Sequence, residues 1–198
     1  RRTSMWCSRT RATATQRVHA KLAPGARLEW LPLETIAYSG CIADNGMRFA
    51  LEPGAEMIGW DVLALGLPAS DQAFTRGRYL QTIELPGRWL ERGLIAASDT
   101  PLLDSPLGWA GRRVMGTLWF AIGGALGTTR RDALLDAARA VIDADALKAS
   151  AGASAVHDGV IVLRVLAPRV EPLMTLLTGV WRAWRAAAWQ LDATPPRV

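Results

Sequence analysis

The sequence predicts a mainly β protein of the α+β class, built from stacked or superhelical sheets with two α-helices in the C-terminal third. Two observations carry this prediction. In the first two thirds of the chain, apolar and polar residues alternate with a period of two in several short segments, as in half-buried strands. Later the apolar period lengthens to that of a helix, over residues 130–147 and 170–190. We therefore expect residues 16–198 to form one β-rich domain with a single core.

The N-terminal part of the chain divides at about residue 16. Residues 1–15 are rich in Arg, Thr, Ser and Ala without any period, so we expect a disordered or loosely attached arm. Residues 16–22 alternate, which predicts a strand. Further along, the pairs Ser39-Gly40 and Asn45-Gly46 are typical of turns, and we expect them to delimit a short strand around Cys41.

Residues 28–36 form an apolar run that is interrupted by two acids and a proline. Pro32 has no amide hydrogen, and it favours an extended backbone at the residue before it, which argues against a helix. The run predicts a strand, a break at Pro32 and a second extended piece. On spacing alone, Glu29 and Glu34 are expected to face water from a bulged or edge strand.

Residues 55–65 form a longer apolar strand that contains Asp61. A buried carboxylate costs several kcal/mol unless it is paired or neutral, so Asp61 needs either a partner or a function. Gly59, two residues earlier, suggests a bulge or a close approach to the backbone. Spacing leaves both interpretations of Asp61 open.

A second carboxylate of interest is Glu91. Residues 74–85 predict a half-solvated strand with outward polar residues, namely Arg76, Arg78, Gln81 and Glu84. In the next strand, residues 88–95, Glu91 shares an inward face with Trp89. Glu91 then either forms an ion pair, with Arg76, Arg78 or Arg112, or lines a wet passage. Spacing favours the ion pair.

The two predicted helices differ in composition. The first has Thr129 as its expected N-cap. The second has a stripe of leucines with Trp181 and Trp184, which we expect in the core. Arg185 and Trp189 lie elsewhere on that helix. Tryptophan and arginine together are typical of interface hot spots, so these two residues are candidates for partner binding.

Composition narrows the function classes. The formal charge of +5 comes almost entirely from arginine. Such a charge is compatible with an acidic protein surface or nucleic acid as a partner, but a base-composition bias toward Arg and Ala explains it better than either. The residues that usually hold a borderline metal are few and scattered: Cys7, Cys41, His19 and His157. A metal contact would therefore depend on carboxylates and be weak. Ser105 lacks the surroundings of a nucleophile, and no triad or phosphate loop is present, so we expect no enzyme.

Residues 28–36 have the sequence LEWLPLETI, which resembles the LEWLPQETI signature of the urease accessory protein family UreD, also called UreH. Later segments resemble the family in the same order: GWDVLALGLP against GWDVLxLGRP, then LERG, the late helices and a closing PPR. Two departures are Leu33, where the family usually has Gln, and Leu67, where it usually has Arg. The chain also resembles a fragment that lacks the family's N-terminal third.

This resemblance implies a mostly β fold with two helices and a non-catalytic role. The two cysteines lie far apart and form no CxxC pair, which favours a cytoplasmic chain with reduced thiols. The resemblance implies partners too: a UreF-type scaffold, a UreG-type GTPase and apo-urease, with neither nucleic acid nor membrane involved. Nickel would pass in transit through a water-filled tunnel, and no cofactor would be bound tightly. Glu91 occupies the family's tunnel-lining L-[ED]-R position, and Asp61 is a second candidate for transient metal contact. The rival interpretation remains a basic adaptor that binds an acidic surface or RNA.

Overall fold

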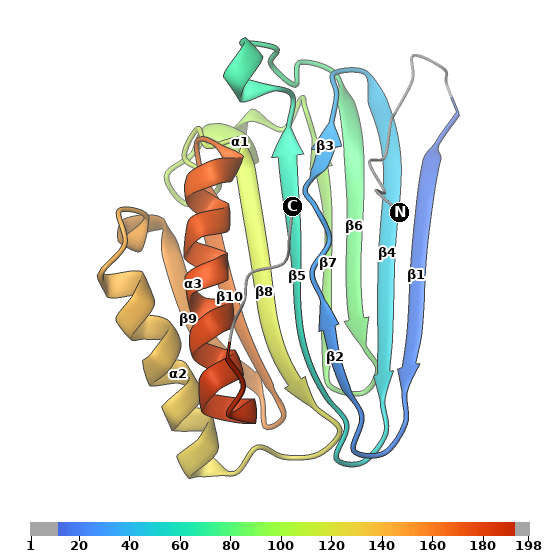
Figure 1. Cartoon of the computed structure of the whole chain (residues 1–198). Helices are drawn as coiled ribbons and strands as arrows, with labels where there is room; N and C mark the ends of the chain where they lie inside the picture. Colours follow the sequence, from blue (N-terminus) through green and yellow to red (C-terminus); the bar gives the residue numbers. More distant parts are fainter. Residues whose placement is uncertain (1–11, 193–198) are drawn as a thin grey trace.

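The computed structural model describes residues 12–192 of the chain (Figure 1). The expected N-terminal arm up to residue 11, with Cys7, lies outside the described residues, and so does the closing PPR segment. The chain folds into two facing β-sheets and a layer of helices, which confirms the predicted mainly β, α+β class. None of the helices in the described part of the chain is long and apolar enough to cross a membrane.

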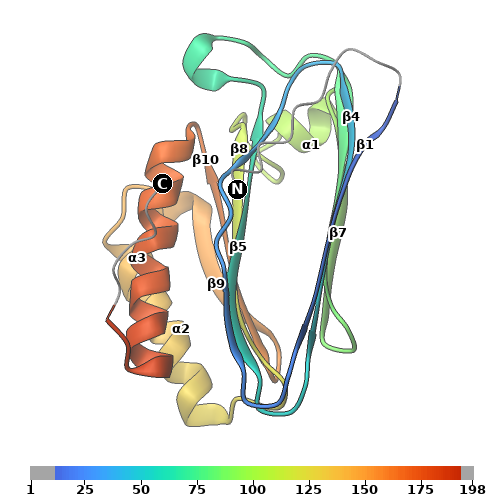
Figure 2. The same cartoon turned by 45° about the vertical axis from the view of Figure 1, so that its right-hand side comes forward.

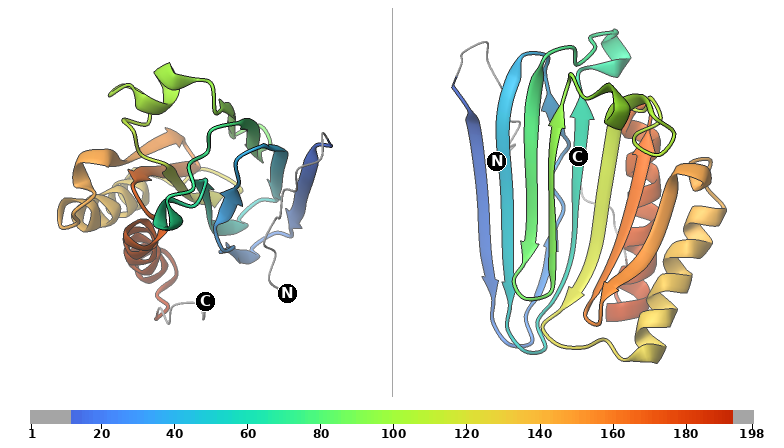
Figure 3. Two further views of the ribbon diagram at one scale, coloured as in Figure 1. Left: turned by 90° about the horizontal axis from the view of Figure 1, so that it is seen from above. Right: turned by 180° about the vertical axis from the view of Figure 1, so that it is seen from behind.

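The first sheet has four strands in the order β1-β4-β6-β7, with β1, β4 and β6 mutually parallel and β7 antiparallel to β6. Its strands are β1 (Ala14–Leu22), β4 (Cys41–Leu51), β6 (Gly77–Leu85) and β7 (Trp89–Ala96). The predicted strand at residues 16–22 thus begins two residues earlier. β1 and β7 are the two edges of this sheet, which Figure 3 shows from behind.

The second sheet follows the order β2-β5-β8-β10-β9, and the short β3 also pairs with β5. Its strands are β2 (Arg27–Trp30), β3 (Thr35–Ala37), β5 (Glu56–Leu65), β8 (Val114–Ile122), β9 (Ala151–His157) and β10 (Val160–Ala167). The predicted break at Pro32 is confirmed, because β2 and β3 both run parallel to β5 with the proline between them.

The long helices cover only one face of the second sheet. α2 (Thr128–Asp143) and α3 (Val170–Trp189) lie side by side on the face that points away from the first sheet (Figure 2). A core of buried side chains fills this contact, with Trp60, Phe120, Leu177 and Trp184 among its members. The other helical turns are short: η1 (Pro68–Ser70), α1 (Thr100–Asp104) and η2 (Lys148–Ser150).

Three local predictions need correction. Asn45 and Gly46 do not form a turn; they lie inside β4, where pairing to both neighbouring strands keeps the backbone extended. α2 begins at Thr128 after Gly127, so Thr129 is not its N-cap, and the helix ends at Asp143 rather than near 147. Gln81 points inward and is only 3% exposed, because it shares the buried face of β6 with Tyr79 and Ile83.

Gly59 allows a close approach rather than a bulge. It pairs in regular register with Trp119 of β8. A Cβ at this position would lie 2.5 Å from the Trp119 indole, which is closer than packed carbon atoms approach. The absence of a side chain at Gly59 therefore lets the indole lie flat across β5.

Candidate functional site

A layer of polar side chains crosses the space between the two sheets. On one side of it lies the α1-side cluster of apolar residues, which includes Ala43, Leu63, Tyr79 and Leu103. On the other side lies the far cluster, which includes Met47, Met57, Ile83 and Trp119. Each central strand passes from one cluster to the other through a polar residue. We call these residues the polar layer: Asn45, Asp61, Gln81, Glu91, Thr117 and Arg164.

Strand register places five of the six members of the polar layer in two facing rows, whereas Glu91 of β7 pairs with Ile83, next to the first row. In the first sheet, Asn45 of β4 is the direct partner of Gln81 of β6. In the second sheet, Asp61 of β5 pairs with Thr117 of β8, which pairs with Arg164 of β10. Side chains alternate between the faces of a strand, and the inward neighbours of these residues belong to the clusters between the sheets. The two rows therefore face each other.

Asp61 is the buried centre of the layer. It is 5% exposed, and Gln81 Nε2 from the opposite sheet donates a hydrogen bond to its Oδ2. Burial raises the pKa of Asp61 to about 7; the hydrogen bond from Gln81 opposes this rise, and the negative charge of Glu91 adds to it. Asp61 therefore changes its charge near neutral pH, and its carboxyl group senses the carboxylate of Glu91.

Several oxygens of the layer are buried without a hydrogen-bond partner among the described protein atoms. These are Asn45 Oδ1, Gln81 Oε1 and Thr117 Oγ1. A buried polar atom is costly unless it is satisfied, so oxygens gathered in one place favour contact with water or a cation. Together with Asp61 and Glu91, they form a set of oxygen donors of the kind that hard and borderline cations accept.

Glu91 lies at one end of the layer, paired across the gap between the sheets. Its Oε2 accepts hydrogen bonds from Arg164, from Nε at 2.9 Å and also from Nη2. The expected partners Arg76, Arg78 and Arg112 are therefore wrong. Arg164 lies on β10 in the opposite sheet, and the contact depends on how the sheets stack, which strand spacing does not reveal.

The sequence patterns did not single out four members of the layer, namely Arg164, Gln81, Asn45 and Thr117. Arg164 interrupts the apolar run Val-Ile-Val-Leu-Arg-Val-Leu, which is the signal that could have marked it. Gln81 lies two residues from each of the inward residues Tyr79 and Ile83, so strand alternation could have placed it on the inward face. Asn45 looked like a turn residue, and Thr117 is unremarkable in a strand, so neither carried a sequence signal of its own.

The two residues proposed for partner contact are engaged within the chain. Trp189 is 6% exposed, and its Nε1 donates to Glu56 Oε2 at 2.6 Å. Arg185 Nη1 donates to both carboxylate oxygens of Glu29, at 2.9 and 2.8 Å. The structure therefore places both residues in the contact between α3 and the second sheet, and a partner role for them stays a prediction.

The residues that would carry the rival adaptor interpretation are also engaged inside the molecule. Trp181 and Trp184 are buried like Trp189, as expected for core residues. With Arg185 paired to Glu29, α3 lacks the exposed stripe of arginine and tryptophan on which binding to RNA or an acidic surface would depend.

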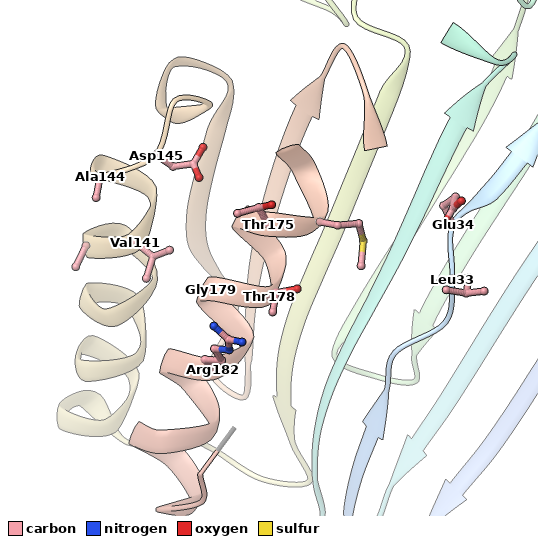
Figure 4. A pocket seen from close by; sticks show the side chains of 11 residues that line it. Leu33, Glu34, Val141, Ala144, Asp145, Thr175, Thr178, Gly179 and Arg182 are labelled. Atoms are coloured by element: carbon pink, nitrogen blue, oxygen red, sulfur yellow. The ribbon is translucent and has the colours of Figure 1, made fainter. Parts of the chain in front are cut away.

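A groove of about 860 Å³ lies on the other side of the second sheet, over α3 (Figure 4). Leu33 and Glu34 line it on one side and the end of α2 lines it on the other, with Asp145 and Arg182 among its polar residues. Leu67 lines a smaller hollow beside the start of α3. The two departures from the family pattern, Leu33 and Leu67, are thus outside the polar layer. Among the described residues, no group of three or more His, Cys, Asp or Glu is arranged to hold a metal ion.

Comparison with known proteins identifies the family to which the chain belongs. A family model described as "UreD urease accessory protein" matches residues 3–198. The two-sheet fold with its polar layer is thus that of a urease accessory protein. Within this class the chain belongs to the UreD family, because the family model covers nearly all of it and curated relatives carry the same name.

Three of these relatives are named urease accessory protein UreD. They come from Leptothrix cholodnii (60% identical), Variovorax paradoxus (59%) and Verminephrobacter eiseniae (58%). The matches cover 93–94% of this chain but only 66–68% of the relatives. The chain thus spans about two thirds of the length of the curated relatives it matches.

Proposed function

We propose that the chain is a non-catalytic part of urease maturation, which conducts Ni²⁺ toward apo-urease along the polar layer between its sheets. Glu91 and Asp61 are the acids that contact the ion in transit. Membership of the UreD family supports the urease context. The placement of both acids in one layer between the sheets is the single observation that supports the route.

The donor set supports transit rather than storage. The described residues offer no cluster of histidines and cysteines, and the layer provides carboxylate, amide and hydroxyl oxygens instead. Nickel prefers nitrogen and sulfur ligands, so an oxygen site holds it weakly and releases it readily. Conduction needs binding that is strong enough for entry and weak enough for exit.

We further propose that the chain acts in the cytoplasm together with a UreF-type scaffold and a UreG-type GTPase, docked on apo-urease. The family name, which places it in urease maturation, supports this assembly. A pull-down of apo-urease and the scaffold–GTPase pair with this chain tests the partners. Retention of all three proteins is the expected outcome, and the loss of every one of them would count against the assembly.

The route is tested by Glu91→Gln in a cell whose only UreD is the full-length protein with these residues. The substitution keeps the shape of Glu91 and removes its charge. We expect urease activity and nickel content per urease to fall about tenfold, which corresponds to about 1.4 kcal/mol in a transfer barrier. Asp61→Asn should act in the same direction.

A matched control is Glu84→Gln. Glu84 lies on the neighbouring strand β6 and is also paired with an arginine, Arg48, but it points to the outer face of the first sheet. This variant should leave nickel insertion unchanged. Full nickel content in the Glu91→Gln cells, at equal levels of the accessory protein, would refute the route.

A further inference from the structure

The polar layer has one end at the surface, between the edge strand β7 and strand β10. Arg164 is 48% exposed in its side chain, whereas its partner Glu91 is 18% exposed, so the ion pair marks the boundary between solvent and interior. Inward along the same row, Thr117 is 1% exposed and Asp61 5%. Along this row the layer therefore passes in one step from a half-exposed side chain at Arg164 to buried side chains at Thr117 and Asp61, so Arg164 marks its surface end.

Two glycines border this end of the layer. Gly93 lies two residues after Glu91, on the same face of β7. Gly152 of β9 is the direct strand partner of Arg164. Both are exposed, and a Cβ added to either would meet no atom of the described part of the chain within 4 Å. Beside Arg164 there is thus open space at both strands. We call this region, formed by Glu91, Gly93, Gly152 and Arg164, the mouth.

Arg164 controls the charge at the mouth. Its guanidinium neutralises Glu91 and places a positive charge where a cation would enter. Both effects oppose the binding of a divalent cation at the two acids. Arg164 is half exposed, so its guanidinium regains water when it is released, and the largely buried carboxylate of Glu91 is then compensated by an incoming cation. The contact can therefore open and close reversibly.

We propose that Arg164 is the gate of the polar layer: paired with Glu91 it closes the mouth, and released from Glu91 it exposes the acid to a divalent cation. This inference rests on the proposed function and adds to it a gating residue and a point of entry or exit. Arg164 acts through Glu91, so it is a positioning residue rather than a metal ligand.

The test measures Ni²⁺ binding to the purified 198-residue chain by equilibrium dialysis. Arg164→Gln should tighten the binding about tenfold, because Glu91 becomes free and a positive charge is lost. The gain should disappear in the double variant Arg164→Gln, Glu91→Gln. Arg164→Lys keeps the charge but cannot form the two-point contact, so its affinity should fall between those of the wild type and Arg164→Gln.

The control is Arg17→Gln, which breaks a similar arginine–carboxylate pair with Asp44 on the outer face of the first sheet. It should leave Ni²⁺ affinity unchanged. Arg164→Gln and Arg164→Lys proteins with the affinity of the wild type would overturn the gate. So would an equal gain in Arg17→Gln, which would show an effect of net charge alone.

A second variant, Gly93→Val, tests the mouth itself. Gly93 has no left-handed backbone and open space at its Cβ, and valine suits a strand, so the fold should be kept. The added side chain lies on the inward face beside Glu91 and should lower nickel insertion into urease severalfold. Gly124→Val, at another glycine with open space, is the control. Normal insertion with Gly93→Val would place the opening elsewhere.

The outcomes separate this inference from the proposed function. If Glu91→Gln lowers insertion about tenfold and the Arg164 variants change nothing, the route stands and the gate is wrong. If Arg164→Gln tightens Ni²⁺ binding through Glu91 while Glu91→Gln leaves insertion intact, the gate on the acid stands and the delivery route is wrong.

Discussion

Asp61 and Glu56 are both buried carboxylates of β5, and their surroundings move their pKa values in opposite directions. Asp61 faces the first sheet, where burial raises its pKa to about 7. Glu56 faces the helices. Burial alone would raise its pKa as well, but hydrogen bonds from Arg130 and Trp189 outweigh this effect, so the pKa is lowered. Which face a residue occupies thus decides whether the acid is charged.

The Asp61 carboxyl predicts an unusual pH dependence of stability. Between its unfolded pKa of 3.8 and its folded pKa of about 7, the unfolded chain has lost this proton and the folded chain keeps it. The free energy of unfolding should therefore fall as pH rises through this window, by up to about 4 kcal/mol from this group, and stay level above it.

Asp61→Asn removes this titration and keeps the size of the side chain. With rising pH, the variant should become more stable relative to the wild type. Urea unfolding of both proteins at pH 4, 5.5 and 7.5 measures this difference in the free energy of unfolding. Glu84→Gln at the surface is the control, and it should show no such trend. A difference that is constant over this pH range would mean that folding does not raise the pKa of Asp61.

At the scale of the element, α3 is held to the second sheet by two carboxylates. Glu29 of β2 accepts hydrogen bonds from Arg185 and from Trp181 Nε1, the latter at 2.9 Å. Glu56 of β5 accepts from Arg130 of α2 and from Trp189 near the end of α3. The acid in the LEWLP signature therefore anchors a helix, and it does not face water as spacing suggested.

Trp189→Phe tests this anchoring. The variant keeps an aromatic ring in the core but removes the N–H that Glu56 accepts, so about 1–2 kcal/mol of unfolding free energy should be lost. Urea unfolding followed by circular dichroism measures the loss. Trp30→Phe is a matched control, because the indole N–H of Trp30 is buried and has no hydrogen-bond partner among residues 12–192. Equal losses in the two variants would show that only ring volume matters.

At the scale of the whole molecule, the two sheets have different outer faces. The helices cover the second sheet, and the outer face of the first sheet carries charged pairs such as Arg48–Glu84 instead. Its edge strand β7 presents Leu90 and Leu94, which are 62% and 55% exposed. An unpaired edge with exposed leucines is a template for pairing with another strand.

We therefore expect the isolated chain to self-associate through β7 at micromolar to millimolar concentrations. Leu94→Lys places a charge on this edge and should shift the population to monomer, as measured by sedimentation velocity. Leu107→Lys alters a fully exposed leucine in the loop after α1 and should leave the association unchanged. A wild-type chain that stays monomeric throughout the concentration range would contradict the expectation.

The strands and helices were accessible from sequence because they depend on local periodicity. Alternation at β1 and β6 and helical spacing at α2 and α3 follow directly from which face is buried. The prediction of a turn at Asn45-Gly46 was wrong, because strands that pair on both sides of β4 override the local turn preference of these residues. The candidate acids Asp61 and Glu91 were found for the same reason, since a carboxylate in an apolar strand stands out.

The sequence alone determined the family, the succession of strands and helices, and the two acids that need an explanation. Only the tertiary structure decided the partners of those acids: Gln81 for Asp61, and Arg164 for Glu91. Each pair joins residues from opposite sheets, at sequence separations of 20 and 73. Periodicity states which face a residue occupies, whereas the stacking and register of two sheets, set by the whole core, determine which residue it meets.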